Sequence, residues 1–277
     1  KKVYAVECSG MVRYARRLVK ANGFENVIQV ILGKVEEVTI PEKVDIIISE
    51  PMGFFLVHER MLESYIIARD RFLKPDGMMF PTTGTMFLSV FSDDSLYKEL
   101  KSKSKFWKQK DFYGFDISGL KDDAQREVFS QPVVGYIPTT SLITATTSTH
   151  VIDFQKDSVD SLKHFQIPFN FIITATSLLH GLACWFDVNF VGSSSEVILS
   201  TAPYSSGTHW YQCRLCLENP LGVNMGQSVT GMLDMKVNED KSYDVTLTMT
   251  LDGTHIKTSG FYHLQDQTYY YGNQEEY

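Results

Sequence analysis

The first ninety residues alternate short apolar runs with segments of helical periodicity. The apolar runs predict strands at 1–7, 27–32 and 44–50. Apolar side chains recur at helical spacing over 10–22 and again over 59–73, which predicts two helices. Continuous apolar strands that alternate with helices are typical of a parallel sheet covered on both faces.

The pattern changes from about Thr85 onward. Short runs rich in Thr, Val, Ile, Phe and Tyr alternate with polar positions, and Gly, Pro and Asn separate them. Clear examples span 85–91, 164–174, 181–192 and 242–253. These runs predict an antiparallel sandwich or barrel. Residues 93–131 interrupt them with a polar, helix-prone insertion, and residues 268–277 are expected to form a frayed end.

Composition narrows the classes of protein that fit. Hydrophobic residues make up 43% and charged residues 21%, which favours a folded core over disorder. The net charge of −7 argues against direct nucleic-acid binding, and the chain has no long apolar run that would indicate a membrane span. Four cysteines are too few for a disulfide scaffold, so a reducing compartment is expected. Cys213 and Cys216 form a C-x-x-C motif on a predicted strand and should point to opposite faces, and no histidine spacing fits a metal site.

The stretch SEPMGFFLVHERMLES sets Glu50 and Glu59 at the two ends of an apolar run. An ionised carboxylate taken out of water without a partner is costly, so this pair requires a cation. The cation is either internal, with Arg60 as the candidate, or part of a ligand. Glu59 also fits a plainer role as an acid at a helix N-terminus, where the helix dipole stabilises it.

Ligands of open parallel sheets bind at the carboxyl ends of the strands. Acidic residues lie at or just past three such ends, namely Glu7, Glu36 or Glu37, and Glu50. A carboxylate at the end of the first strand can accept two hydrogen bonds from a ribose diol. The alternative for each of these positions is a solvated acid at the end of a strand.

Five motifs, in their order and spacing, resemble the protein arginine methyltransferases: YAVE, GKVEEV, VDIIISEPMGFFLVHERMLES, FLKPDGMMFP and THWYQ. The chain is most similar to the coactivator-associated, type I branch of that family. The resemblance implies a Rossmann-like S-adenosylmethionine-binding domain at 1–82 and a β-barrel domain at 83–277, with a dimerisation arm at about 100–131. It also implies that the family's glycine-rich cofactor loop precedes Lys1, so that the Rossmann-like domain is expected to be partial.

The resemblance assigns roles to nine residues. Glu50 and Glu59 would bind the guanidinium of a substrate arginine, and His209 would pass on the released proton. Trp210 and Met52 would line the substrate-binding site. Four residues would contact the cofactor, namely Glu7, Val35, Glu36 and Met61. For both methionines the plainer alternative is a role as core filler.

The function implied is transfer of a methyl group from S-adenosylmethionine to a guanidinium nitrogen of arginine. The expected products are monomethyl and asymmetric dimethyl arginine on histones, coactivators and RNA-binding proteins, in the nucleus and the cytoplasm. A homodimer is expected. Two alternatives remain: a catalytically inert fragment that docks and dimerises through the barrel and arm, and methyl transfer to another nucleophile.

Overall fold

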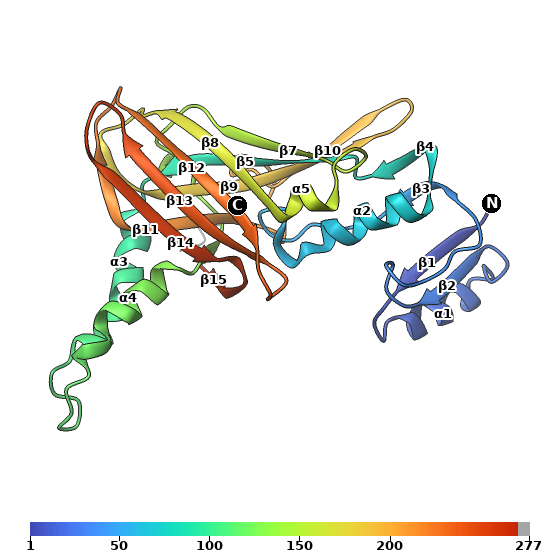
Figure 1. Cartoon of the computed structure of the whole chain (residues 1–277), viewed down its shortest axis with the longest axis horizontal. Coiled ribbons are helices and arrows are strands. Elements are labelled where there is room, and N and C mark those ends of the chain that lie inside the picture. The colour runs from blue at the N-terminus through green and yellow to red at the C-terminus, as the bar shows by residue number, and fades with distance from the viewer. Residues whose placement is uncertain (271–277) are drawn as a thin grey trace.

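The structure is a computed structural model that describes residues 1–270. It divides into a smaller α/β part, a large pair of antiparallel sheets, and a helical arm that projects from the sheets (Figure 1). The expectation of a frayed end is wrong for Thr268 and Tyr269, which pair in parallel with Val133 and Val134, and the rest of that segment from 271 onward lies outside the described residues. No helix of residues 1–270 is long and apolar enough to cross a membrane.

Two β-α-β units form the N-terminal part. The first joins β1 (Val3–Glu7) and β2 (Ile28–Leu32) in parallel through α1 (Val12–Ala21). The second joins β3 (Val44–Ile48) and β4 (Leu73–Phe80) through α2 (Met61–Phe72). The predicted helices and strands are confirmed to within two residues at most ends. Among the described residues, however, the strands form two separate parallel pairs instead of one continuous sheet.

The remaining strands build two antiparallel sheets. The larger sheet has seven strands, in the order β15-β6-β11-β9-β5-β7, with β10 also paired to β9. Its strands are β5 (Thr83–Phe91), β6 (Val133–Gly135), β7 (Ser148–Asp153), β9 (Ser177–Val191), β10 (Glu196–Ser200), β11 (Gln212–Val223) and β15 (Thr268–Tyr269). The smaller sheet has the order β14-β13-β12-β8, with strands β8 (His164–Ile172), β12 (Ser228–Val237), β13 (Tyr243–Leu251) and β14 (Lys257–His263).

The expected closed barrel is not formed by backbone pairing within residues 1–270, because no ladder joins the two sheets. Side chains bridge their edges instead. The Tyr262 hydroxyl on β14 donates to the Cys216 carbonyl on β11 at 3.0 Å, and His150 stacks on Phe165 at 4.6 Å. On the β6 side of β11 the pairing ends at Arg214, and the helix α5 (Val159–Lys163) separates β7 from β8 along the chain.

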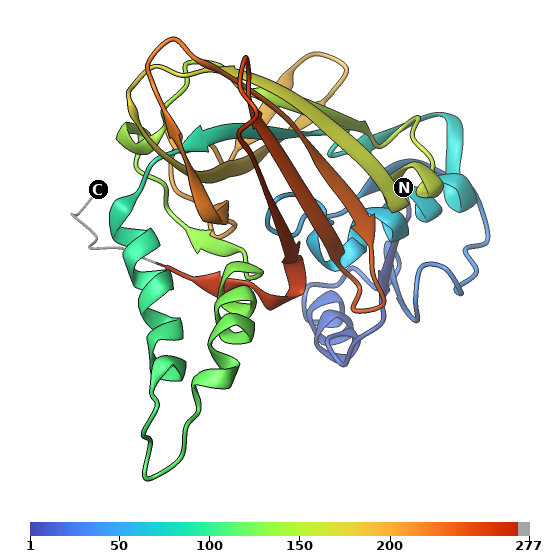
Figure 2. The same cartoon turned by 60° about the vertical axis from the view of Figure 1, so that its left-hand side comes forward.

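The polar, helix-prone insertion forms a helical arm. Helices α3 (Asp94–Lys103) and α4 (Lys121–Phe129) run side by side away from the sheets (Figure 2). Asp93 caps α3, because its carboxylate accepts the Leu96 backbone N–H at 2.9 Å.

The main hydrophobic core lies between the two sheets and also takes in the loop before α2 and one face of α2. Leu62, Tyr65 and Ile66 are at most 3% exposed and belong to this core. A much smaller cluster of Val38, Ala68 and Phe72 attaches the first β-α-β unit to the other side of the helix. The two cysteines of the C-x-x-C motif face opposite ways as predicted, since Cys213 lies in the main core and Cys216 in the cluster at the base of the arm.

Candidate functional site

The segment between β3 and α2 is a buried, tightly turned loop. Residues 51–57 are buried, whereas Glu50 before them and Glu59 after them are exposed. Four non-glycine residues adopt positive φ angles, at Phe55 (49°), Leu56 (67°), Glu59 (70°) and Arg60 (57°). Such conformations cost about 1–3 kcal/mol each and persist where packing over-determines them, which is common at functional sites.

Gly53 allows the loop to close. A Cβ atom at this position would lie 2.1 Å from the carbonyl oxygen of His58, which no side chain tolerates. The Gly53 N–H donates to the Leu56 carbonyl at 3.1 Å. The loop is therefore folded back on itself, and both acids are held at its two ends.

Arg60 is not the partner of this acid pair. Its guanidinium makes a two-pronged contact with Glu63, at 2.7 Å from Nε and 2.9 Å from Nη2, and also donates to the Asn238 carbonyl. The Arg60 side chain is thereby committed to anchoring the first turn of α2. Neither Glu50 nor Glu59 forms a hydrogen bond or ion pair with any residue of 1–270. An internal cation, which the sequence left open, is therefore lacking over this range, and both carboxylates are free to take a cation from a ligand.

The Thr-His-Trp segment reaches this loop from the other half of the chain. The Trp210 indole Nε1 donates to the Met52 carbonyl at 2.9 Å, and its ring packs edge-on against Phe186 at 5.8 Å. His209 is exposed and lies against the Trp210 ring, with the ring centroids 3.9 Å apart. The structure thus brings Met52 and Trp210 into direct contact. It does not join His209 to either acid by a hydrogen bond within residues 1–270.

The predicted cofactor residues lie around the first β-α-β unit and the start of α2. Glu7 ends β1, and its carboxylate accepts the Ser9 backbone N–H at 2.6 Å, which lowers the pKa of Glu7. Glu36 follows β2 and accepts a hydrogen bond from the Ser64 hydroxyl in the first turn of α2. Met61 opens the same helix and is 46% exposed.

These positions fit an adenosine-containing cofactor. Glu7 and Glu36 lie at the carboxyl edge of the β1-β2 pair, where such sheets bind nucleotides. The Val35 carbonyl is already taken by Arg71, which also donates to the Val38 carbonyl at 2.8 Å. The Val35 backbone N–H donates no hydrogen bond within residues 1–270. Over residues 1–270, no group of three possible metal-ligating side chains occurs.

Three supporting residues could not be recognised from the sequence. Arg71 holds the loop after β2, Ser64 orients Glu36, and Ser242 lies 2.9 Å from Nδ1 of His58. Ser64 and Arg71 both lie on α2, about one turn and about three turns after its first residue. Polar positions on the side of a helix that faces the cofactor loop would identify such residues. The helical pattern alone, however, does not show which part of the molecule a polar face contacts.

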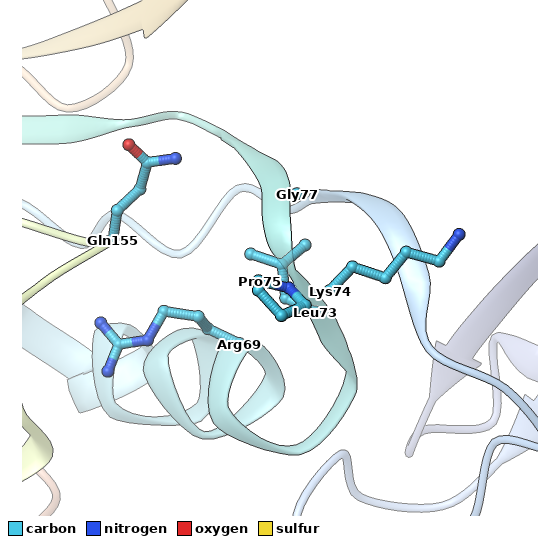
Figure 3. A pocket seen from close by; sticks show the side chains of 6 residues that line it. All are labelled: Arg69, Leu73, Lys74, Pro75, Gly77 and Gln155. Carbon is cyan, nitrogen blue, oxygen red and sulfur yellow. The ribbon is translucent and has the colours of Figure 1, made fainter.

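A pocket of about 360 Å³ lies elsewhere, at the far end of α2 (Figure 3). Its lining is Arg69, Leu73, Lys74, Pro75, Gly77 and Gln155. Arg69 lies eight residues after Met61, about 12 Å along the helix. Its guanidinium donates to the carbonyls of Phe154 and Asp157 at 2.8 Å, so it ties α2 to the following loops. This pocket is separate from the acid pair.

Known proteins are similar to this chain. A profile of the arginine methyltransferase oligomerization subdomain matches residues 82–254. Histone-arginine methyltransferase CARMER of Drosophila willistoni is 45% identical over 270 residues, which are 98% of this chain and 50% of that protein. The chain thus spans about half the length of the curated relatives it matches.

Two solved structures resemble the chain along nearly all of its length. The Trypanosoma brucei PRMT1 enzyme-prozyme heterotetrameric complex with AdoHcy has a TM-score of 0.81 and 33% identity, and the match covers 95% of this chain and 82% of that one. Arabidopsis thaliana protein arginine methyltransferase 10 has a TM-score of 0.81 and 30% identity, covering 94% and 82%. On both the sequence and the structural likeness, this chain belongs to the protein arginine methyltransferase family.

Proposed function

We propose that this chain carries the substrate-binding and part of the cofactor-binding machinery of an S-adenosylmethionine-dependent protein arginine N-methyltransferase. The single observation that carries the proposal is the unpaired acid pair. Glu50 and Glu59 stand at the two ends of a strained loop that is bonded to Trp210, and within residues 1–270 neither has a cationic partner. A protein that holds two carboxylates in this way is suited to bind an external cation.

Arginine is the cation that best matches the site. Its guanidinium stays protonated and offers paired donors in one plane, which two carboxylates can accept as charge-assisted hydrogen bonds. The carboxylates of Glu50 and Glu59 draw the positive charge toward the nitrogens they bind. The remaining terminal nitrogen then keeps electron density and can act as a nucleophile. Trp210 forms one wall by cation–π contact, worth about 0.5–2 kcal/mol.

The bound methyl donor supplies an electrophilic sulfonium methyl group. Glu7 would hold the ribose hydroxyls, while the Val35 N–H and Glu36 would meet the adenine edge. Met52 and Met61 would border the space between cofactor and substrate, and exclude water from it. His209, exposed beside Trp210, would accept the proton that the guanidinium nitrogen releases and pass it to solvent.

The domain division at residue 82, the dimerisation arm at about 100–131 and the barrel-like closure of the sheets belong to the same proposal. We propose that the products are monomethyl and asymmetric dimethyl arginine, on histones and on coactivator and RNA-binding proteins. The relatives are named histone-arginine methyltransferases, which supports histones and a nuclear site of action. Cytoplasmic activity and a homodimer complete the proposal.

The test is transfer of a labelled methyl group from S-adenosylmethionine to an arginine peptide, run on this chain and on any longer natural form of it. Labelling should require arginine, and a peptide with lysine at the same position should stay unlabelled. Labelling of the lysine peptide would instead support methyl transfer to another nucleophile. The Glu50→Gln variant should lose most of the rate, and an unchanged rate would refute the role of the acid pair.

The alternative is a docking module without activity, and the arm favours it. Tyr113 and Phe115 at the arm's tip are 89% and 72% exposed, as expected for a surface that a partner covers. Calorimetry with S-adenosylmethionine separates the two functions. Measurable affinity of this chain for S-adenosylmethionine would refute the hypothesis of an inert docking module. No affinity and no activity in any natural form would favour docking as the function.

A further inference from the structure

A second acidic position lies on the outer face of the seven-stranded sheet. Along β9, Phe186 and Val188 point into the main core, so Trp185 and Asp187 point to the opposite face. Asp187 is partly buried, yet one of its carboxylate oxygens is shielded from solvent and has no hydrogen-bond partner within residues 1–270. Over the same range, no cationic side chain forms an ion pair with it. The carboxylate therefore resembles Glu50 and Glu59 in lacking a counter-ion.

A group of three aromatic rings lies next to Asp187 on this part of the sheet, centred on Trp185. Phe87, the cross-strand partner of Trp185 on β5, stacks on the indole with the centroids 5.8 Å apart and the planes at 7°. Tyr204, from the loop after β10, meets the indole edge-on at 6.3 Å. The charge of Asp187 reaches Tyr204, whose pKa is raised by burial and by that carboxylate. Trp185 thus contacts both other rings, and Tyr204 lies within electrostatic reach of the Asp187 carboxylate.

Tyr204 is the solvent-exposed member of this group. Tyr204 is 68% exposed, while Trp185 beneath it is only 1% exposed. The Trp185 indole Nε1 is buried and has no acceptor within residues 1–270, so a second polar group there also lacks a partner. Burial raises the pKa of Asp187, and the nearby Ser200 hydroxyl and Thr201 amide offset that effect only in part. A carboxylate without a counter-ion beside an exposed aromatic ring is the chemistry that recognises an organic cation.

We propose that Asp187, Trp185, Tyr204 and Phe87 form a second binding site for a side-chain cation, a guanidinium or ammonium group, carried by a basic protein segment. The loop that supplies Tyr204 continues directly to His209 and Trp210. Trp210 packs against Phe186 on one face of β9, while Trp185 and Asp187 lie on the other face, so the second site is distinct from the acid pair. Only the identification of that segment as the methylation substrate rests on the proposed function.

The three tryptophans of the chain allow a direct test. Trp185 reports on the second site, Trp210 on the acid pair, and Trp107 in the arm is the internal control. Each gives one indole N–H signal in a ¹H–¹⁵N spectrum, assigned from the Trp→Phe variants. The probe is N-methylguanidinium chloride, and its neutral analogue N-methylurea is the matched control.

N-methylguanidinium should shift the Trp185 signal saturably, and N-methylurea should not. Asp187→Asn keeps the shape of the side chain. It should raise the N-methylguanidinium concentration that half-saturates the Trp185 shift at least tenfold, and it should leave the Trp210 response intact. Tyr204→Ala changes an exposed loop residue and should not disturb folding, but it should also lower the affinity for N-methylguanidinium. Tyr204→Phe should retain that affinity.

A Trp185 signal that does not move, or that moves equally in Asp187→Asn or with N-methylurea, overturns the second site. A shift of Trp210 alone supports the proposed function and overturns the second site. A shift of Trp185 alone supports the second site while the acid pair fails as a guanidinium site.

Discussion

Two glutamates four residues apart should respond to the same mutation in opposite ways. Glu59 forms no ion pair or hydrogen bond with residues 1–270, while Glu63 holds Arg60 through two charge-assisted hydrogen bonds of 2.7 and 2.9 Å. Replacing either by glutamine changes the charge by one and keeps the shape. Only the surroundings differ, so each variant is the control for the other.

The expected magnitudes follow from those surroundings. Glu59→Gln removes no internal partner, and its free energy of unfolding should stay within about 0.5 kcal/mol of the parent. Glu63→Gln weakens a partly buried contact to a charged group, which should lower the free energy of unfolding by about 1–3 kcal/mol. For the rate of methyl transfer, the order of the two variants reverses, and Glu59→Gln should have the larger effect. Loss of one preorganised charge contact to the reacting group costs about 10²–10³ in rate, which we expect for Glu59→Gln.

Urea unfolding followed by fluorescence gives the first quantity, and labelled methyl transfer under saturating cofactor gives the second. Glu63→Gln should retain the methylation rate to within about tenfold, since Glu63 acts on the substrate only through the helix start. A stability loss in Glu59→Gln as large as that in Glu63→Gln would show that Glu59 has an internal partner. An unchanged rate in Glu59→Gln would remove it from the site.

Three further predictions test the surrounding structure. Trp210→Phe removes the bond to the Met52 carbonyl but keeps a ring against Phe186, so it should lower the free energy of unfolding by about 1–2 kcal/mol and raise the KM for an arginine peptide; an unchanged KM would contradict the contact's role. Gly53→Ala places a Cβ against the His58 carbonyl and should cost more than about 2 kcal/mol by chemical denaturation, whereas Gly119→Ala, with nothing within 4 Å, should be nearly neutral. Burial lowers the pKa of His180, whose Nδ1 accepts the Asp93 N–H at 3.0 Å. The folded protein therefore prefers the neutral imidazole, and the unfolded chain takes up the proton first. Stability should fall as the pH drops through about 6.5, the ordinary value for histidine, and this fall should be shallower in His180→Gln; equal pH profiles would refute the linkage.

The secondary structure of the first ninety residues could be predicted because apolar periodicity there is strong and local. The helix at 61–72 and the strands at 28–32 and 44–48 lie within two residues of their predicted bounds. Sheet closure could not be predicted in the same way. It depends on which strand edges meet in space, and the alternation of side chains along a strand does not show which neighbour its edge pairs with.

For the site, the sequence singled out Glu50 and Glu59 because charged residues at both ends of an apolar run are conspicuous. It did not settle their counter-ion. Arg60 was an equally good candidate on spacing, and only the three-dimensional contact to Glu63 removes it. The left-handed conformations of Phe55 and Leu56 were also hidden, since nothing in their side chains favours a positive φ.

The division of α2 between two hydrophobic clusters of unequal size has a consequence for cooperativity. Leu62 and Ile66 join the large core of the sheets, whereas Ala68 and Phe72 are the main link to the first β-α-β unit. The amides of β1 and β2 should therefore exchange with solvent through a sub-global opening, well before those of α2. Glu59 would stay in place during that opening while Glu7 moved away. The free energy of this opening, which a ligand on Glu7 and Glu36 would increase, sets how tightly the first unit is coupled to the rest of the molecule.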